Sequence, residues 1–189
     1  MSVYVPFRKK FAVFDTETTG LTVHQKSNLR LQPRIIEFAG IITDGVEVLD
    51  SIEFLVNPNI PLEEIIKKIT GLKDEDLVDC AEWTEYQDQV AGFFSKADVA
   101  IAHNLSFDKN MLINDCRRFD LDFAALNFPA IGCCTVEQTM HQYGRRMKLS
   151  DLYEMWVGSY VQKHRAMDDI GLLDQICHRL GVYDAFNVR

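Results

Sequence analysis

Two acidic residues, Asp15 and Glu17, end an apolar segment that begins at Phe11. Side chains alternate between the two faces of a strand, so both carboxylates are expected on one face, roughly 6–7 Å apart along the strand. A strand this apolar is typical of a buried central position, where two like charges so close together favour a bound counter-ion. The pair therefore indicates a cation site, although a polar strand end that meets water is the alternative.

A third acid, Asp108, lies near the start of an expected helix over residues 106–119. It precedes Met111, Leu112 and Phe119 by three, four and eleven positions, so it shares their apolar face. The alternative is an aspartate in the first helical turn that is stabilised by the helix dipole and has no further role. The periodicity leaves these two interpretations open.

The segment HRAMDDI near the C-terminus contains two adjacent aspartates that helical periodicity separates. Asp169 shares a face with Leu173, Ile176 and Leu180, whereas Asp168 faces a more polar side. Asp169 is therefore expected to point inward and Asp168 to be a surface acid. An inward carboxylate is costly by itself, so Asp169 requires a metal ion, a cation or a proton.

His164 precedes Asp169 by five residues, which on one continuous helix would place them roughly 140° apart. The two side chains converge only if His164 lies in the loop before the helix, and we expect it there. A surface or capping role is the alternative for a single histidine.

Four inward acids have the donor chemistry of a site for two Mg²⁺ or Mn²⁺ ions, because hard cations prefer oxygen ligands. Two ions roughly 4 Å apart can activate a water molecule, orient a phosphodiester and stabilise a leaving 3′ oxygen. His164 is then expected to take the proton of the water as general base. In a purely structural alternative each acid would pair with a cation, and the nearby candidates, Arg165, Lys109 and Lys163, could serve one or two of the acids but not all four.

Strand and helix patterns predict an α/β protein with a mixed five-stranded sheet and helices on both faces. We expect one domain over residues 1–189, because the chain has 47% hydrophobic residues and no linker-like segment. A hairpin turn is expected at Asp44-Gly45 and a helix stop at Gly181. The expected strands are 11–17, 34–43, 46–56, 99–103 and 128–133, and the expected helices are 62–69, 86–95, 106–119, 136–143, 148–157 and 165–180.

Composition restricts the function further. The five cysteines lack C-x-x-C spacing, and no segment is long enough to span a bilayer or resembles a signal peptide, so we expect reduced thiols, a cytoplasmic location and no membrane partner. A net charge of −8 argues against a broad basic face for duplex binding. An enzyme that holds only a few terminal nucleotides through bound cations needs no such face.

Three motifs occur in order: DTETTGL over residues 15–21, HNLSFD over 103–108 and HRAMDD over 164–169. Together with RIIE at 34–37 and ITG at 69–71, they resemble the DEDDh exonucleases, the DnaQ-like group that contains the proofreading epsilon subunit of bacterial DNA polymerase III, RNase T and oligoribonuclease. The resemblance implies an RNase H-like fold. It also implies that four acids bind two metal ions and that one histidine is the general base, these residues being Asp15, Glu17, Asp108, Asp169 and His164.

The same resemblance implies where the 3′-terminal nucleotide binds. Backbone groups of Thr18, Thr19 and Gly20 are expected to contact the terminal sugar and phosphate, with Leu21 wedged near the terminal bases. The residues expected to line the site are His103, Asn104 and Phe107.

We expect the substrate to be the 3′ end of single-stranded DNA, in proofreading or end trimming. The same chemistry on RNA is the nearest alternative, because discrimination depends on contacts to the 2′-hydroxyl that no motif reveals. A catalytically silent adaptor that binds 3′ ends or a polymerase is a third hypothesis. The segment Thr22–Pro33 is longer than the usual link at this point, and the chain ends soon after the third motif. We therefore expect a free enzyme, or one that reaches a DNA polymerase through surface contacts.

Overall fold

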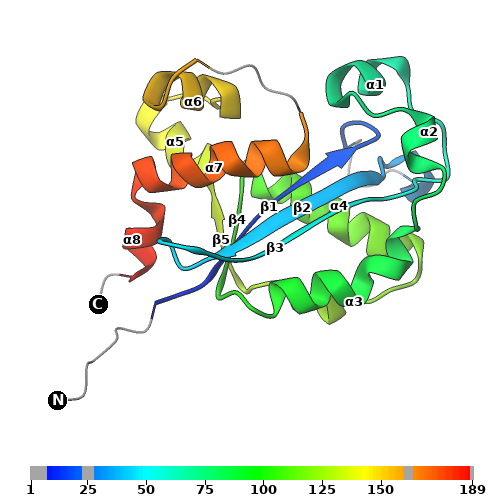
Figure 1. The fold of residues 1–189 in the computed structure, drawn as a ribbon, viewed down its shortest axis with the longest axis horizontal. Coiled ribbons are helices and arrows are strands. Elements are labelled where there is room, and N and C mark those ends of the chain that lie inside the picture. The colour runs from blue at the N-terminus through cyan, green and yellow to red at the C-terminus, as the bar shows by residue number, and fades with distance from the viewer. Residues whose placement is uncertain (1–7, 23–27, 160–163, 188–189) are drawn as a thin grey trace.

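A computed structural model describes residues 8–22, 28–159 and 164–187, which form a twisted sheet with helices packed on both faces (Figure 1). The order of strands across the sheet is β3-β2-β1-β4-β5. β2 is antiparallel to β1 and β3, whereas β4 is parallel to β1 and β5. This mixed five-stranded sheet confirms the predicted RNase H-like class; its strands are β1 (Phe11–Thr18), β2 (Ile35–Thr43), β3 (Val48–Leu55), β4 (Val99–Ala102) and β5 (Ile131–Cys134).

Each face of the sheet carries its own apolar core. Phe11 and Val13 of β1 pack against α7, whereas Ala12 and Phe14 pack against α3 and α4. The helices are α1 (Glu64–Thr70), α2 (Asp74–Leu77), α3 (Trp83–Phe94), α4 (Leu105–Arg118), α5 (Thr135–Tyr143), α6 (Leu149–Trp156), α7 (Ala166–Leu180) and α8 (Val182–Asn187), with short 3₁₀ turns at Leu29–Leu31 and Phe123–Leu126.

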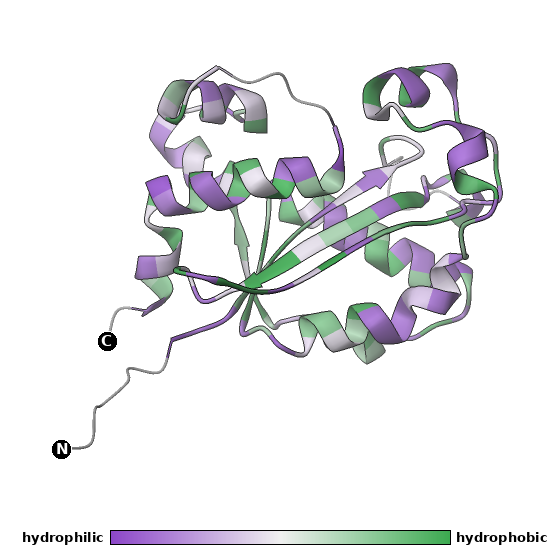
Figure 2. Ribbon diagram, in the orientation of Figure 1, coloured by the Kyte–Doolittle hydropathy of each residue, from purple (hydrophilic) through white to green (hydrophobic). Residues whose placement is uncertain are grey.

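The alternation along β1 decides where its acids point. Asp15 and Glu17 lie at alternate positions after Phe11 and Val13, so all four side chains point to the face of the sheet that α7 covers. In Figure 2 the arrowhead of β1 is purple, which marks the hydrophilic end of this strand. The carboxyl end of a buried central strand thus carries two acids toward one helix.

The hairpin between β2 and β3 is longer than the two-residue turn that was predicted. Thr43 pairs with Val48, and the Asp44 carboxylate accepts the N–H groups of Val46 and Glu47. Gly45 is required here, because its φ is +83° and a Cβ would lie 2.6 Å from Tyr183.

Two other details differ from the sequence expectations. Ile65 and Ile69 helped to predict the first helix, yet their side chains are 54% and 42% exposed. Gly181 ends α7 with a φ of +65°, as expected, but the chain continues directly as α8. All five cysteines are free, and no helix in the described residues has both the length and the apolar character needed to cross a membrane.

Candidate active site

The site lies at the carboxyl end of β1. Pairing between β1 and β4 stops at Val13. Beyond that point, the Asp108 carboxylate of α4 is hydrogen-bonded to Thr16 of β1. Its Oδ1 accepts the Thr16 N–H at 3.2 Å and the Thr16 hydroxyl at 2.8 Å, while the side chain is almost fully buried. Asp108 is therefore fixed against the residue between Asp15 and Glu17.

The start of α7 brings the remaining two predicted residues to the same place. Asp169 lies in the first turn of α7 and is 5% exposed. His164 precedes the helix and adopts a left-handed backbone with φ of +50°. One ligand atom each from Glu17, His164 and Asp169 lie within 4.8 Å of one another. The structure thus brings the acids and the histidine of the three motifs together.

A buried ion pair ties α7 to the sheet beside this cluster. Glu37 of β2, the register partner of Glu17, is fully buried. Its carboxylate accepts the Arg165 Nε–H at 3.0 Å, the Arg165 Nη2–H at 2.7 Å and the Ala166 N–H at 3.2 Å. These bonds fix the first residues of α7 to β2 and with them the approach of His164 to the site.

The Glu37–Arg165 pair also affects the alternative in which the four acids are neutralised by nearby lysine and arginine side chains. Arg165 is bound to Glu37, and Lys109 lies over the Phe128 ring at 5.1 Å from its centroid. The third candidate, Lys163, lies outside the described residues. Two of the three candidate cations are thus engaged with groups outside the cluster.

The clustered carboxylates strongly favour protonation or a cation. Burial raises the pKa of Asp15 well above its usual value, and repulsion from Asp108, Glu17 and Asp169 raises it further. Burial, with repulsion chiefly from Asp169, raises the pKa of Glu17 to about 8. The pKa of Asp108 rises to about 7 through burial, against the opposing effect of its bonds to Thr16. A compact set of oxygen donors that resists full ionisation fits hard divalent cations.

These pKa shifts predict that Glu17→Gln stabilises the metal-free protein increasingly as the pH rises. The Glu17 pKa is 4.5 ordinarily and about 8 in the folded chain, so its protonation stabilises the fold below pH 4.5, and this stabilisation is lost as the pH rises toward 8. Gln cannot ionise, so its advantage over the wild type in Tm is expected to grow to roughly 5 °C between about pH 5 and pH 8.

Differential scanning fluorimetry in EDTA measures this difference in Tm, with Asp168→Asn as the matched control. In a parallel measurement without EDTA, added Mg²⁺ or Mn²⁺ is expected to raise the Tm of the wild type more at pH 8 than at pH 5, because metal ions bind deprotonated carboxylates. A Glu17→Gln advantage in Tm that does not change with pH would show that the Glu17 pKa is not raised in the folded protein.

The carboxylates face a cleft of about 730 Å³ that two basic residues also line. Arg146 and Lys148, in the connection between α5 and α6, both line it and are both exposed. The sequence interpretation did not identify either residue. The local signal was present, because Arg145, Arg146 and Lys148 form a compact basic segment in an acidic chain.

His103 lines the cleft but uses both ring nitrogens within the protein. Nε2 lies 3.1 Å from the carbonyl oxygen of Met147, and Nδ1 lies 2.8 Å from the hydroxyl of Thr135. A carbonyl only accepts, so Nε2 donates and Nδ1 accepts from Thr135. Burial lowers the His103 pKa to about 4, which keeps the ring neutral. Its polar atoms hold the basic segment in place and are not turned to the cleft.

Asn104 supports the same segment. It adopts φ of +77° at the start of α4, and its side-chain oxygen accepts a hydrogen bond from Arg146 at 2.8 Å. Phe107, one turn farther along α4, lines the cleft and is partly buried. All three residues therefore line the cleft, and His103 and Asn104 also hold the segment that carries Arg146.

The turn after β1 lies directly beside Glu17 but does not line the cleft. The Thr18 hydroxyl donates to the carbonyl of Gly20 at 2.7 Å, and the Thr19 N–H donates to the carbonyl of Arg34 at 2.9 Å. Leu21 is 82% exposed. The turn is thus held by a bond within itself and by a bond to Arg34, and it presents an apolar side chain to solvent.

A protein-family model and several bacterial DNA polymerases match the sequence of this chain. The model of the RNase T family, described as an exonuclease, matches residues 12–176. The DNA polymerase III PolC-type of Caldanaerobacter subterraneus subsp. tengcongensis is 29% identical over 160 residues, and that of Staphylococcus aureus is 30% identical over 160 residues. These matches cover 85% and 84% of this chain but only 11% and 10% of the polymerases, so the chain spans about a tenth of these relatives.

Solved structures share the fold at low sequence identity. The nuclease domain of 3′hExo, a DEDDh family member bound to rAMP, has a TM-score of 0.75 and 16% identity over 97% of this chain and 96% of its own. The zinc-bound E. coli ExoI–ssDNA complex has a TM-score of 0.73 and 17% identity over 95% of this chain and 43% of its own. Because the family model spans residues 12–176, the chain belongs to the RNase T exonuclease family.

Proposed function

We propose that this exonuclease hydrolyses the 3′-terminal nucleotide of single-stranded DNA, with two Mg²⁺ or Mn²⁺ ions held by Asp15, Glu17, Asp108 and Asp169. The observation that carries the proposal is the convergence of Glu17, His164 and Asp169 within 4.8 Å in the cleft that Asp15 and Asp108 also line. Bound divalent ions supply Lewis-acid activation of water and neutralise charge on the phosphate.

His164 is the proposed general base. It lies before α7 rather than within it, and the Glu37–Arg165 pair fixes the residues that follow. In the proposed reaction the water oxygen bonds to phosphorus, His164 accepts the water proton, and the bond from phosphorus to the 3′ oxygen breaks. That oxygen then takes up a proton, and a nucleoside 5′-monophosphate leaves. Histidine suits this role because an imidazole titrates near neutral pH.

The DNA substrate is favoured by the relatives, and RNA remains the second candidate. The matched PolC-type proteins are DNA polymerases, which supports a DNA 3′ end and a DNA polymerase as partner. The RNA alternative is supported by two structural neighbours: the 3′hExo nuclease domain bound to rAMP, and a 3′-exonuclease that recognises a histone mRNA stem-loop. Both substrates present the same terminal phosphodiester to the carboxylates.

Digestion of 5′-labelled single-stranded DNA and sequence-matched RNA separates these two candidates. We expect a ladder that shortens from the 3′ end, requires Mg²⁺ or Mn²⁺, stops in EDTA and proceeds faster on DNA. Faster digestion of RNA would select the second candidate. An unshortened substrate under metal-replete conditions would favour the silent adaptor.

Arg146 is proposed to bind a substrate phosphate in the cleft that the acids also line. Arg146→Met is expected to raise KM roughly tenfold with little change in kcat, because an arginine–phosphate contact contributes on the order of 1–3 kcal/mol. The matched control is Arg145→Met, since Arg145 is exposed and does not line the cleft. Equal KM values for the two variants at low salt would remove Arg146 from substrate binding.

A further inference from the structure

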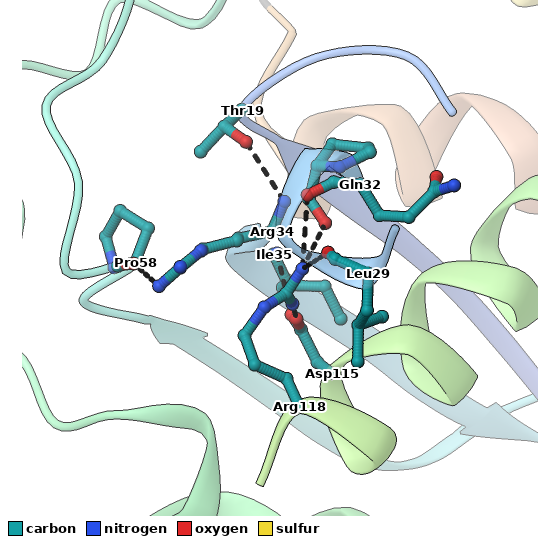
Figure 3. Close-up of polar contacts among 9 residues, drawn as sticks. Thr19, Leu29, Gln32, Arg34, Ile35, Pro58, Asp115 and Arg118 are labelled. Atoms are coloured by element: carbon teal, nitrogen blue, oxygen red, sulfur yellow. Dashed lines mark hydrogen bonds and ion pairs between the residues drawn. The ribbon is translucent and has the colours of Figure 1, made fainter. Parts of the chain in front are cut away.

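A buried ion pair at the end of α4 holds the loop that returns from the turn after β1 to β2 (Figure 3). The Arg118 guanidinium donates to the carbonyl oxygens of Leu29, Gln32 and Pro33 at 3.2, 3.1 and 3.4 Å. It also forms an ion pair with Asp115, and the two side chains are 11% and 4% exposed. We call Asp115 and Arg118 the loop anchor.

The loop anchor continues into the first residue of β2. Oδ2 of Asp115 accepts the Ile35 N–H at 2.8 Å. Next to Ile35, the Arg34 guanidinium donates to the carbonyl of Pro58 at 2.6 Å. The returning loop is therefore fixed from two sides where it enters the sheet.

Arg34 connects the anchored loop to the turn beside the active site. The Thr19 N–H donates to the Arg34 carbonyl at 2.9 Å, and the Arg34 N–H donates to the Thr19 hydroxyl at 3.0 Å. A displacement of residues 29–35 therefore carries Thr19 with it. The same helix holds Thr16 through Asp108 at its other end, so α4 fixes both sides of the turn.

A gain in folding stability alone does not explain the buried Asp115–Arg118 ion pair. Removing a guanidinium and a carboxylate from water is costly, and an apolar pair of similar volume is often as stable. What an apolar pair lacks is donors for three loop carbonyls. The loop anchor thus contributes a defined loop position that exists before any ligand binds, which lowers the entropic cost of binding.

We propose that Asp115 and Arg118 are positioning residues for the substrate: through Arg34 they hold the turn Thr18–Leu21, which lies beside Glu17 at the carboxyl end of β1. This inference rests on the proposed function and on the expectation, from the family resemblance, that the turn contacts the 3′-terminal nucleotide at the edge of the cleft.

The test compares Arg118→Met with Arg117→Met, a neighbouring exposed arginine on the same helix. Arg118→Met is expected to raise KM for a 5′-labelled oligonucleotide roughly tenfold, with kcat within about twofold of the wild type. The Kd for Mn²⁺ is expected to be unchanged, because no proposed metal ligand is altered. Arg117→Met is expected to match the wild type in all three measurements.

Limited proteolysis provides a readout that is independent of activity. Trypsin is expected to cleave after the exposed Arg30 several-fold faster in Arg118→Met than in Arg117→Met, because the loop has lost its anchor. Faster cleavage with an unchanged KM would overturn the positioning role, and so would unchanged cleavage. If Arg118→Met does not fold, the milder Asp115→Asn is expected to show the same KM-only effect. A wild-type protein without metal-dependent exonuclease activity would refute the proposed function, while the cleavage rates still report whether the anchor holds the loop.

Discussion

Asp169→Asn is expected to reduce kcat by about 10³-fold, the scale of losing a stabiliser of transition-state charge, whereas Asp168→Asn leaves it within about twofold. The two residues are adjacent, but Asp169 is 5% exposed and lies at the carboxylate cluster, and Asp168 does not line the cleft. Asparagine keeps the shape of the side chain and removes its charge. The comparison therefore isolates the position of the carboxylate on α7.

Steady-state release of nucleoside 5′-monophosphate measures both variants, and their Tm values in EDTA serve as the control for folding. Asp169→Asn is expected to match or exceed the wild type in Tm, because one of several mutually repelling charges is gone. An inactive Asp168→Asn with an active Asp169→Asn would show that the wrong aspartate has been assigned to the site.

His164→Ala is expected to lower kcat by about 10²-fold or more, the usual contribution of a general base, while KM changes little. A ring nitrogen of His164 lies within 4.8 Å of one carboxylate oxygen each of Glu17 and Asp169, so His164 could act as a proton acceptor or as a metal ligand. Metal affinity distinguishes these two roles. A general base can be removed without loss of metal affinity. The Kd for Mn²⁺ is therefore expected to be unchanged in His164→Ala.

The pH dependence provides a second discriminating measurement for His164. Activity of His164→Ala is expected to rise with pH over the range in which wild-type activity has levelled off, because hydroxide replaces the missing base. His141→Ala, at an exposed histidine outside the cleft, is the matched control. A His164→Ala variant that loses Mn²⁺ binding would assign the imidazole to the metal ions instead.

The placement of Asp15, Glu17 and Asp169 was predictable because it depends on local periodicity, whereas the periodicity left two interpretations of Asp108 open. β1 is buried on both faces, so its alternation fixed Asp15 and Glu17 on one side. Along α7 the buried Leu173 and Ile176 defined the inward face that Asp169 shares. For His164, helical geometry showed only that it converges with Asp169 from a loop position and not from within the helix.

Contacts between distant segments were not predictable in this way. Glu37 and Arg165 are 128 residues apart, and nothing in their local patterns connects them. Arg118 likewise reaches carbonyl groups more than eighty residues away, at Leu29 and Pro33. Backbone acceptors have no residue-type signature, so such bonds appear only once the chain is folded. In α1 the apolar periodicity predicted the helix correctly. It did not show whether the apolar side chains are buried, and Ile65 and Ile69 are exposed.

Isothermal titration of Mn²⁺ into the metal-free protein, with Asp169→Asn as the paired variant, tests whether the clustered carboxylates bind the metal ions. We expect two Mn²⁺ ions per wild-type chain, with proton release because the carboxylates have raised pKa values, and weakened binding in Asp169→Asn. Absence of Mn²⁺ binding to the folded wild-type protein, or binding that Asp169→Asn leaves unchanged, would contradict the assignment of the carboxylate cluster as the metal site of this exonuclease.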